Sequence, residues 1–323
     1  MNNKINDSKE NYELANGMTI PIIAFGTGVV RRFYRNKSKY YKDVIIALLR
    51  SLKHLKMVRF LKNDLTLKKI LNDAIGAGYT MFDSGRLYGH SEKYIGEVIS
   101  AYNRDNLFLI TKVCEDDLKR YPNTNNVHDT LSLSLKFLKT DYVDAYLLHF
   151  PCPNMIEMYK EIEKEYKAGR AKVIGVCNFD VDELKTLMKA CEIKPMINQI
   201  ELNPINTRRD VREFCKENGI IVMAHTPTAR SNIKAIGDTN IMKSLTKKYN
   251  KSVAQIIYRW HVQNGVIPIV SSVSKEHLYS NLEIFDFCLE DEEMESIEAL
   301  NQNKTCDRYN NKKSDCADFI YNL

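Results

Sequence analysis

The chain has 323 residues, of which 44% are hydrophobic and 27% are charged, and its formal net charge is +6. This composition suits a globular protein, and no apolar run approaches the roughly 20 residues that a membrane-spanning helix needs. The polar start MNNKINDSKENYE lacks the apolar centre of a signal peptide, so we expect a cytoplasmic protein.

The basic charge is concentrated in one segment. Residues 31–62 contain 11 lysines and arginines against one acid, Asp43, and the remainder of the chain has a small negative net charge. This distribution does not predict a nucleic-acid-binding protein. The eight cysteines form no CxxC pair and no cluster with histidine at zinc spacing, so we expect free thiols and no metal site.

Short apolar runs alternate along the chain with longer charged stretches at helical spacing. Strands are predicted at 21–26, 79–83, 107–111, 143–149, 171–176, 196–202, 220–225 and 266–270. Helices are predicted at 66–77, 91–102, 125–138, 154–168, 180–191, 207–218, 252–264 and 275–284. Eight such units predict an α/β fold, a (β/α)8 TIM barrel forming one domain over 1–323. The segment MTIPI (18–22) predicts an added N-terminal β-hairpin at the barrel floor.

Four complementary polar side chains stand at or just after strand ends. Asp83 and Tyr88 lie in FDSGRLYGHSE, Lys112 ends LFLITK and His149 ends VDAYLLH. In a (β/α)8 barrel these positions lie on the rim where chemistry is built. A tyrosine near its free pKa of about 10 is a poor acid, but a neighbouring lysine cation held by a carboxylate favours the phenolate. The four residues therefore predict a proton-transfer site.

These motifs resemble those of the aldo-keto reductase family over most of residues 17–300. The resemblance rests on IIAFGTG (22–28), YTMFDSGRLYGHSEKYIG (79–96), LFLITK (107–112), DYVDAYLLHFP (141–151), GRAKVIGVCNF (169–179), INQIELNP (197–204) and SVAQIIYRW (252–260). It implies a catalytic tetrad of Asp83, Tyr88, Lys112 and His149. The implied reaction is hydride transfer between a nicotinamide cofactor and a carbonyl or alcohol, with Tyr88 as general acid. The alternative is a regulatory or scaffolding barrel that binds cofactor with little turnover.

The same resemblance implies a cofactor site and several departures from its usual form. His225 replaces a tyrosine that stacks on the nicotinamide, while Ser271 and His277 replace the lysine and arginine that hold the 2′-phosphate of NADP. Lys275 and Arg230 are the residues that could compensate, so NADPH is expected and NADH remains open. The implied cofactor-binding residues are Gly26, Thr27, Gly28, Asn178, Gln199, His225, Ser271, Ser272, His277 and Asn281.

The substrate pocket is expected to take a small carbonyl compound. The resemblance assigns Leu87, Cys114 and Phe150 to it, and Gly28, Cys114 and Phe150 stand where many relatives carry tryptophan. The one tryptophan, Trp260, is predicted to lie in a helix core. Residues 301–323 correspond to the family's variable loop over the substrate.

The basic segment 31–62 is an insertion in the first βα loop. Its apolar residues from Val44 to Leu55 fall on one face of a predicted helix. Three roles stay open: packing on the barrel's top face or self-association, a lid near the substrate, and contact with an anionic membrane surface. We accordingly expect a monomer or a weak homo-oligomer.

Overall fold

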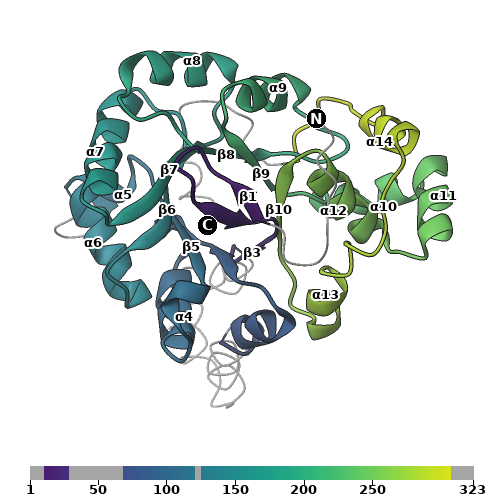
Figure 1. The fold of residues 1–323 in the computed structure, drawn as a ribbon, viewed down its shortest axis with the longest axis horizontal. Helices are drawn as coiled ribbons and strands as arrows, with labels where there is room; N and C mark the ends of the chain where they lie inside the picture. Colours follow the sequence, from purple (N-terminus) through teal and green to yellow (C-terminus); the bar gives the residue numbers. More distant parts are fainter. Residues whose placement is uncertain (1–10, 29–67, 121–124, 307–323) are drawn as a thin grey trace, which may run out of the picture.

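The computed structural model describes residues 11–28, 68–120 and 125–306. Its centre is a closed barrel in which parallel strands follow the order β10-β3-β4-β5-β6-β7-β8-β9 (Figure 1). The strands are β3 (Ala24–Gly26), β4 (Met81–Asp83), β5 (Phe108–Val113), β6 (Val143–Leu148), β7 (Ala171–Cys177), β8 (Ile197–Glu201), β9 (Ile221–His225) and β10 (Val266–Val270). The predicted (β/α)8 fold is confirmed. The insertion 31–62 and residues 307–323 lie outside the described residues.

The strands are buried on both faces, which is why their sequences show no apolar/polar alternation. All six residues of β5 and all six of β6 are buried. Alternate side chains enter two different cores, since successive residues of a strand point to opposite faces. Ala145 and Leu147 pack inside the barrel, while Tyr146 and Leu148 pack against the surrounding helices.

Helices surround the barrel, as Figure 1 shows. They are α4 (Ser91–Ile99), α5 (Asp117–Arg120), α6 (Val127–Leu138), α7 (Met155–Lys167), α8 (Val181–Ala190), α9 (Arg209–Glu217), α10 (Ile233–Gly237), α11 (Asn240–Tyr249), α12 (Val253–Gln263), α13 (Lys275–Ser280) and α14 (Asp291–Glu298), with a further helical stretch at 68–77. Helices α5, α10, α11 and α14 were not predicted from the sequence. Trp260 is fully buried in α12, as predicted.

The N-terminal hairpin closes one end of the barrel. Strands β1 (Asn11–Glu13) and β2 (Thr19–Pro21) pair antiparallel, which confirms the predicted hairpin. Leu14 and Ile20 are buried and join the apolar cluster inside the barrel. The Tyr12 hydroxyl donates to the Val262 carbonyl at 2.9 Å and so fastens the hairpin to the end of α12.

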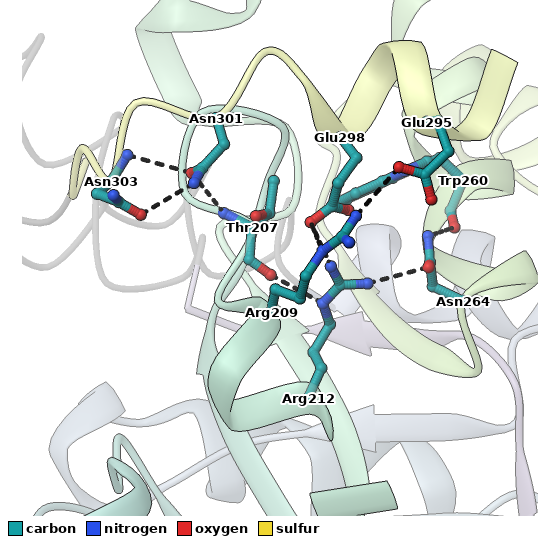
Figure 2. A network of polar contacts seen from close by, with 9 residues as sticks. All are labelled: Thr207, Arg209, Arg212, Trp260, Asn264, Glu295, Glu298, Asn301 and Asn303. Atoms are coloured by element: carbon teal, nitrogen blue, oxygen red, sulfur yellow. Dashed lines mark hydrogen bonds and ion pairs between the residues drawn. The ribbon is translucent and has the colours of Figure 1, made fainter. Parts of the chain in front are cut away.

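A polar network joins α9 to α14 and to the chain that follows α14 (Figure 2). Arg212 contacts Glu298 at 2.6 Å, and Arg209 contacts both Glu295 and Glu298. The backbone N–H of Thr207 donates to the Asn301 side chain at 3.2 Å. The network therefore holds the start of the 301–323 segment beside the loop that follows β8.

Within the described ranges, no helix is long and apolar enough to span a membrane.

Candidate active site

The barrel brings the predicted acid, amine and imidazole to one rim. Asp83 is the last residue of β4, Lys112 lies near the end of β5, and His149 directly follows β6. The strand registers align them, because Asp83 pairs with Ile110 and Lys112 pairs with Leu147. The predicted strand ended at residue 111, but β5 continues through Lys112 to Val113.

Lys112 is a fully buried cation with charged and polar partners. Its Nζ lies 2.6 Å from Asp83 Oδ1 and donates to the Ser84 carbonyl at 2.6 Å. Burial disfavours the charged form of Lys112, but Asp83, with smaller contributions from Tyr88 and Cys177, outweighs this and raises the pKa of the ammonium above its ordinary value. Gln199 on β8 donates to the same Asp83 oxygen at 2.8 Å. The ion pair is therefore fixed by groups from β4, β5 and β8.

Tyr88 lies over this ion pair and beside His149. It ends a short 3-10 turn, η1 (Arg86–Tyr88), and is half-buried, whereas Asp83, Lys112 and His149 are buried. Lys112 Nζ is 4.8 Å from the centroid of the Tyr88 ring. The Tyr88 and His149 rings meet edge to face with centroids 5.8 Å apart. All four predicted catalytic residues thus lie in one cluster.

Two of the predicted nicotinamide residues continue this cluster. Asn178 follows β7 with φ of +63° and donates to the His149 carbonyl at 3.1 Å. His225 Nε2 lies 2.9 Å from Asn178 Oδ1, and since an amide oxygen only accepts, Nε2 carries the proton in this contact. His225 is therefore tied to Asn178 through its ring edge.

The turn after β3 is also fastened to the cluster. Thr27 is fully buried, and both its N–H and its hydroxyl donate to the Asp83 carbonyl, at 3.0 and 2.8 Å. Gly26 packs so closely on Ile269 that an added Cβ would lie 2.8 Å from the Ile269 Cγ2. A Cβ at Gly28 would lie 4.0 Å from the Tyr88 ring. This turn consequently borders the tyrosine.

The residues predicted to hold the far end of the cofactor occupy a separate segment after β10. Ser271 and His277 are exposed, Ser272 is half-buried and Asn281 is buried. Ser272 donates to the Ser274 carbonyl at 3.2 Å, and Ser274 caps the N-terminus of α13. The basic side chains of Lys275 and Arg230 are exposed. Among these residues after β10, the side chains of Ser271, Lys275 and His277 are therefore the ones exposed to solvent.

The three predicted substrate residues differ in how much surface they present. Phe150 is half-buried and stacks on His149 with ring centroids 4.4 Å apart. Leu87 and Cys114 are 4% and 1% exposed. The Cys114 thiol donates to Asp117 Oδ2 at 3.3 Å, directed into the protein.

Sequence reasoning missed a buried polar cluster behind the tyrosine turn. Arg86 and Glu92 form an ion pair, and Thr111 donates to the other Glu92 oxygen at 2.6 Å. Asp117 is also buried, and burial raises the pKa of its carboxyl to about 6. Both Arg86 and Glu92 stand in FDSGRLYGHSE, but charged residues near a loop are ordinarily read as exposed. The one signal in the sequence that could have identified Arg86 and Glu92 was their position on either side of Tyr88.

Other expectations concern thiols and metals. Among the described residues, the cysteines at 114, 152, 177, 191, 215, 288 and 306 carry thiols and form no disulfide. Among the same residues, no group of three or more His, Cys, Asp and Glu side chains is arranged to hold a metal ion.

Comparison with known proteins gives a consistent result. The sequence model of the Aldo/keto reductase family matches residues 61–302. The chain is 37% identical over 233 residues to glyoxal reductase of Bacillus subtilis, covering 72% of this chain and 82% of the relative. It is 34% identical over 239 residues to methylglyoxal reductase DkgA of Escherichia coli, covering 72% and 84%. A crystal structure of a Bombyx mori aldo-keto reductase in complex with NADP matches with a TM-score of 0.75 at 29% identity, over 94% of this chain and 96% of that one.

Proposed function

This chain belongs to the aldo/keto reductase family, and we propose that Tyr88 is the general acid of its carbonyl reduction. The protein is an NAD(P)H-dependent oxidoreductase that transfers a hydride between a nicotinamide cofactor and a carbonyl or alcohol. The observation that carries the assignment of Tyr88 is its position 4.8 Å from the buried Lys112 ammonium and edge to face with His149.

The residues at the rim are chemically suited to a nicotinamide. Asn178 uses one N–H toward His149 and one lone pair toward His225, so its amide retains a donor and an acceptor for a second carboxamide. When bound, a reduced nicotinamide supplies the hydride. Asn178 and Gln199 would hold its carboxamide, and the turn of Gly26, Thr27 and Gly28 would lie under its ribose.

Tyr88 would donate its phenolic proton to the carbonyl oxygen as negative charge develops there. A positioned acid of this kind is typically worth about 10²–10⁴-fold in rate. Lys112 makes the tyrosine a usable acid because its cation favours the phenolate that remains after transfer. Asp83 keeps Lys112 charged, and Gln199 and Thr27 keep Asp83 in place. His149 would orient the carbonyl oxygen toward Tyr88.

The substrate is proposed to be a small aldehyde or ketone. The relatives are named as reductases of glyoxal and methylglyoxal, which makes these two dicarbonyls the first compounds to test. Leu87, Cys114 and Phe150 are proposed to line the substrate side, with Phe150 offering the most surface. We propose a cytoplasmic enzyme that acts as a monomer or a weak homo-oligomer.

NADPH is the proposed cofactor. A family structure with NADP supports it, and the exposed Lys275, two residues before His277, and the exposed Arg230 are the proposed sources of positive charge for a 2′-phosphate. NADH stays the alternative, because the usual pair of 2′-phosphate cations is replaced in this chain.

An oxidation assay tests the proposal. Purified protein is mixed with NADPH or NADH and a panel that includes glyoxal, methylglyoxal and larger aldehydes and ketones, and cofactor absorbance is followed. We expect turnover with at least one small carbonyl and a preference for NADPH. Tight cofactor binding without turnover of any carbonyl would contradict the proposal and favour a scaffolding barrel.

A further inference from the structure

Tyr88 stands within a loop whose two sides are joined by polar contacts. The loop runs from Ser84, after β4, to Glu92 in the first turn of α4. The Ser84 and Ser91 hydroxyls lie 2.6 Å apart, and Arg86 forms an ion pair with Glu92, the residue after Ser91. Both contacts are buried, and Tyr88 lies between the residues that they join. The segments before and after Tyr88 are therefore joined by two buried polar contacts.

The same ion pair reaches the strand that carries Lys112. Glu92 accepts a hydrogen bond from Thr111 Oγ1 at 2.6 Å with one oxygen while its other oxygen contacts Arg86. Thr111 and Lys112 are consecutive residues of β5, so their side chains leave the strand on opposite faces. One carboxylate thus links the turn that carries the phenol to the strand that carries the ammonium.

The backbone of the loop needs such a link. Gly89 directly follows Tyr88 and has φ of +67°, a conformation that glycine adopts at low cost, and the 3-10 turn itself is only three residues long. On the other side, Gly85 packs on the site, since a Cβ added there would lie 3.5 Å from Lys112 Cβ and 3.7 Å from His149 Cε1. A shift of the turn would therefore change the distance between Tyr88 and Lys112.

We infer that Arg86 and Glu92 are positioning residues, which hold the Tyr88 turn in register with Lys112 so that the phenol can act as the acid. This inference rests on the proposed function. Buried ion pairs often add little stability relative to apolar residues of similar size, and some of them instead specify one geometry. The planar guanidinium of Arg86 suits that task, and it lies 5.1 Å from the Phe137 ring centroid on α6.

The chain contains a matched control at the opposite end of β5. Arg104 Nη2 lies 2.6 Å from Asp144 Oδ2, which also accepts from the Leu109 N–H at 2.7 Å. The Arg104 guanidinium lies 4.2 Å from the Tyr142 ring centroid. This pair links an arginine, a carboxylate, β5 and an aromatic ring as the Arg86 pair does, but it lies away from Tyr88.

The experiment compares Arg86→Met/Glu92→Gln with Arg104→Met/Asp144→Asn in the full-length protein. For each, the measurements are unfolding by urea, cofactor binding by fluorescence, KM, and the pH profile of kcat. We expect kcat of the first variant to fall on the order of 10- to 100-fold with cofactor affinity unchanged, because small misplacements of a reacting group cost this much. Its alkaline limb should move to higher pH, since Tyr88 loses part of the influence of Lys112. The Arg104→Met/Asp144→Asn variant should be less stable to urea, while its kcat, its cofactor affinity and its pH profile stay unchanged.

Single variants keep the test decisive if the double variant unfolds. Glu92→Gln retains the shape and the acceptor for Thr111, and it should show the same fall in kcat. A kcat equal to that of the Arg104 variant, or a fall in kcat without movement of the alkaline limb, would overturn the inference. Tyr88→Phe, assayed in parallel, separates the two proposals: if it is fully active, the proposed acid is wrong, whatever Arg86 does.

Discussion

At the ends of β4 and β5, Lys112 and Asp83 are buried and hydrogen-bonded, with Lys112 Nζ 2.6 Å from Asp83 Oδ1. After β10, by contrast, the side chains of Ser271, Lys275 and His277 are exposed. The first region is built by the fold before any ligand arrives, because Lys112 and Asp83 are each held by further protein groups, the Ser84 carbonyl and the Gln199 amide. In the second, the polar groups face water, so a bound phosphate would have to order them. We therefore expect substitutions in the first region to alter folding and chemistry, and substitutions in the second to alter cofactor choice alone.

The largest expected effect comes from removing the buried ammonium. Lys112→Met leaves the Asp83 carboxylate buried without its counter-charge, which typically costs about 3–5 kcal/mol of unfolding free energy. Carbonyl reduction should also fall, because Tyr88 loses the neighbouring cation. Urea unfolding and steady-state assays measure both. Lys275→Met is the control, and an exposed substitution of this kind should change stability by less than about 0.5 kcal/mol. Equal stability of the two variants would remove the contrast between the regions.

A second effect concerns Asp117, beside the tyrosine turn. Its pKa is raised from 3.8 to about 6 in the folded protein, chiefly by burial. The native state therefore binds the proton more tightly than the unfolded chain, so this contribution to stability is full below pH 3.8 and is lost as pH rises through about 6. Its size is on the order of 3 kcal/mol.

Asp117→Asn isolates that contribution. The stability of the variant relative to the native chain should increase between pH 4 and pH 8, since only the native chain loses stability through this carboxyl over that interval. Urea midpoints at a series of pH values provide the measurement. A difference between the two proteins that does not change with pH would show that Asp117 ionises as an ordinary carboxyl.

A smaller effect is expected at the contact between His225 and Asn178. His225→Phe keeps an aromatic ring but removes the Nε2 donor that lies 2.9 Å from Asn178 Oδ1. One hydrogen bond is worth about 1 kcal/mol, so the Kd of the cofactor should rise roughly fivefold. The loss should be equal for NADPH and NADH, because both share the nicotinamide end. An unchanged Kd for both would mean that His225 does not orient Asn178.

The smallest effects are expected after β10 and near η3 (Arg230–Asn232). Lys275→Ala and Arg230→Ala should each weaken NADPH binding by up to about fivefold, as exposed ion pairs contribute at most about 1 kcal/mol. NADH binding should not change, because it lacks the 2′-phosphate. Fluorescence titration with both cofactors measures this. Equal losses of NADPH and NADH affinity would mean that these cations do not bind the 2′-phosphate.

Much of the first region could be predicted from the sequence. The strands that carry Asp83 and Lys112 and the strand that precedes His149 are short, mostly apolar and buried on both faces, so their ends could be located and assigned to one rim. The position of Tyr88 followed from its distance to Asp83 along the chain. The end of β5 was wrong by two residues because Lys112 itself pairs with Leu147, although a charged residue ordinarily indicates a strand end.

The buried cluster of Arg86 and Glu92 could not be predicted in the same way. Charged side chains indicate a surface unless their partners are known, and Thr111 and Phe137 come from other elements. The outer helices α11 and α14 were missed because each buries only one or two apolar residues, and part of the contact between them is polar. Lys248 on α11, for example, reaches Glu290 and Glu293 at 2.6 and 2.8 Å. The insertion 31–62 keeps its three open roles.

The most direct test of the central claim is the rate of reduction in a single turnover by Tyr88→Phe, with cofactor binding measured on the same sample. The variant retains the ring that lies over Lys112 and lacks only the phenolic oxygen. We predict that the rate falls about 10²–10⁴-fold while the cofactor Kd stays the same. A single-turnover rate equal to that of the native chain would contradict the assignment of Tyr88 as the proton donor.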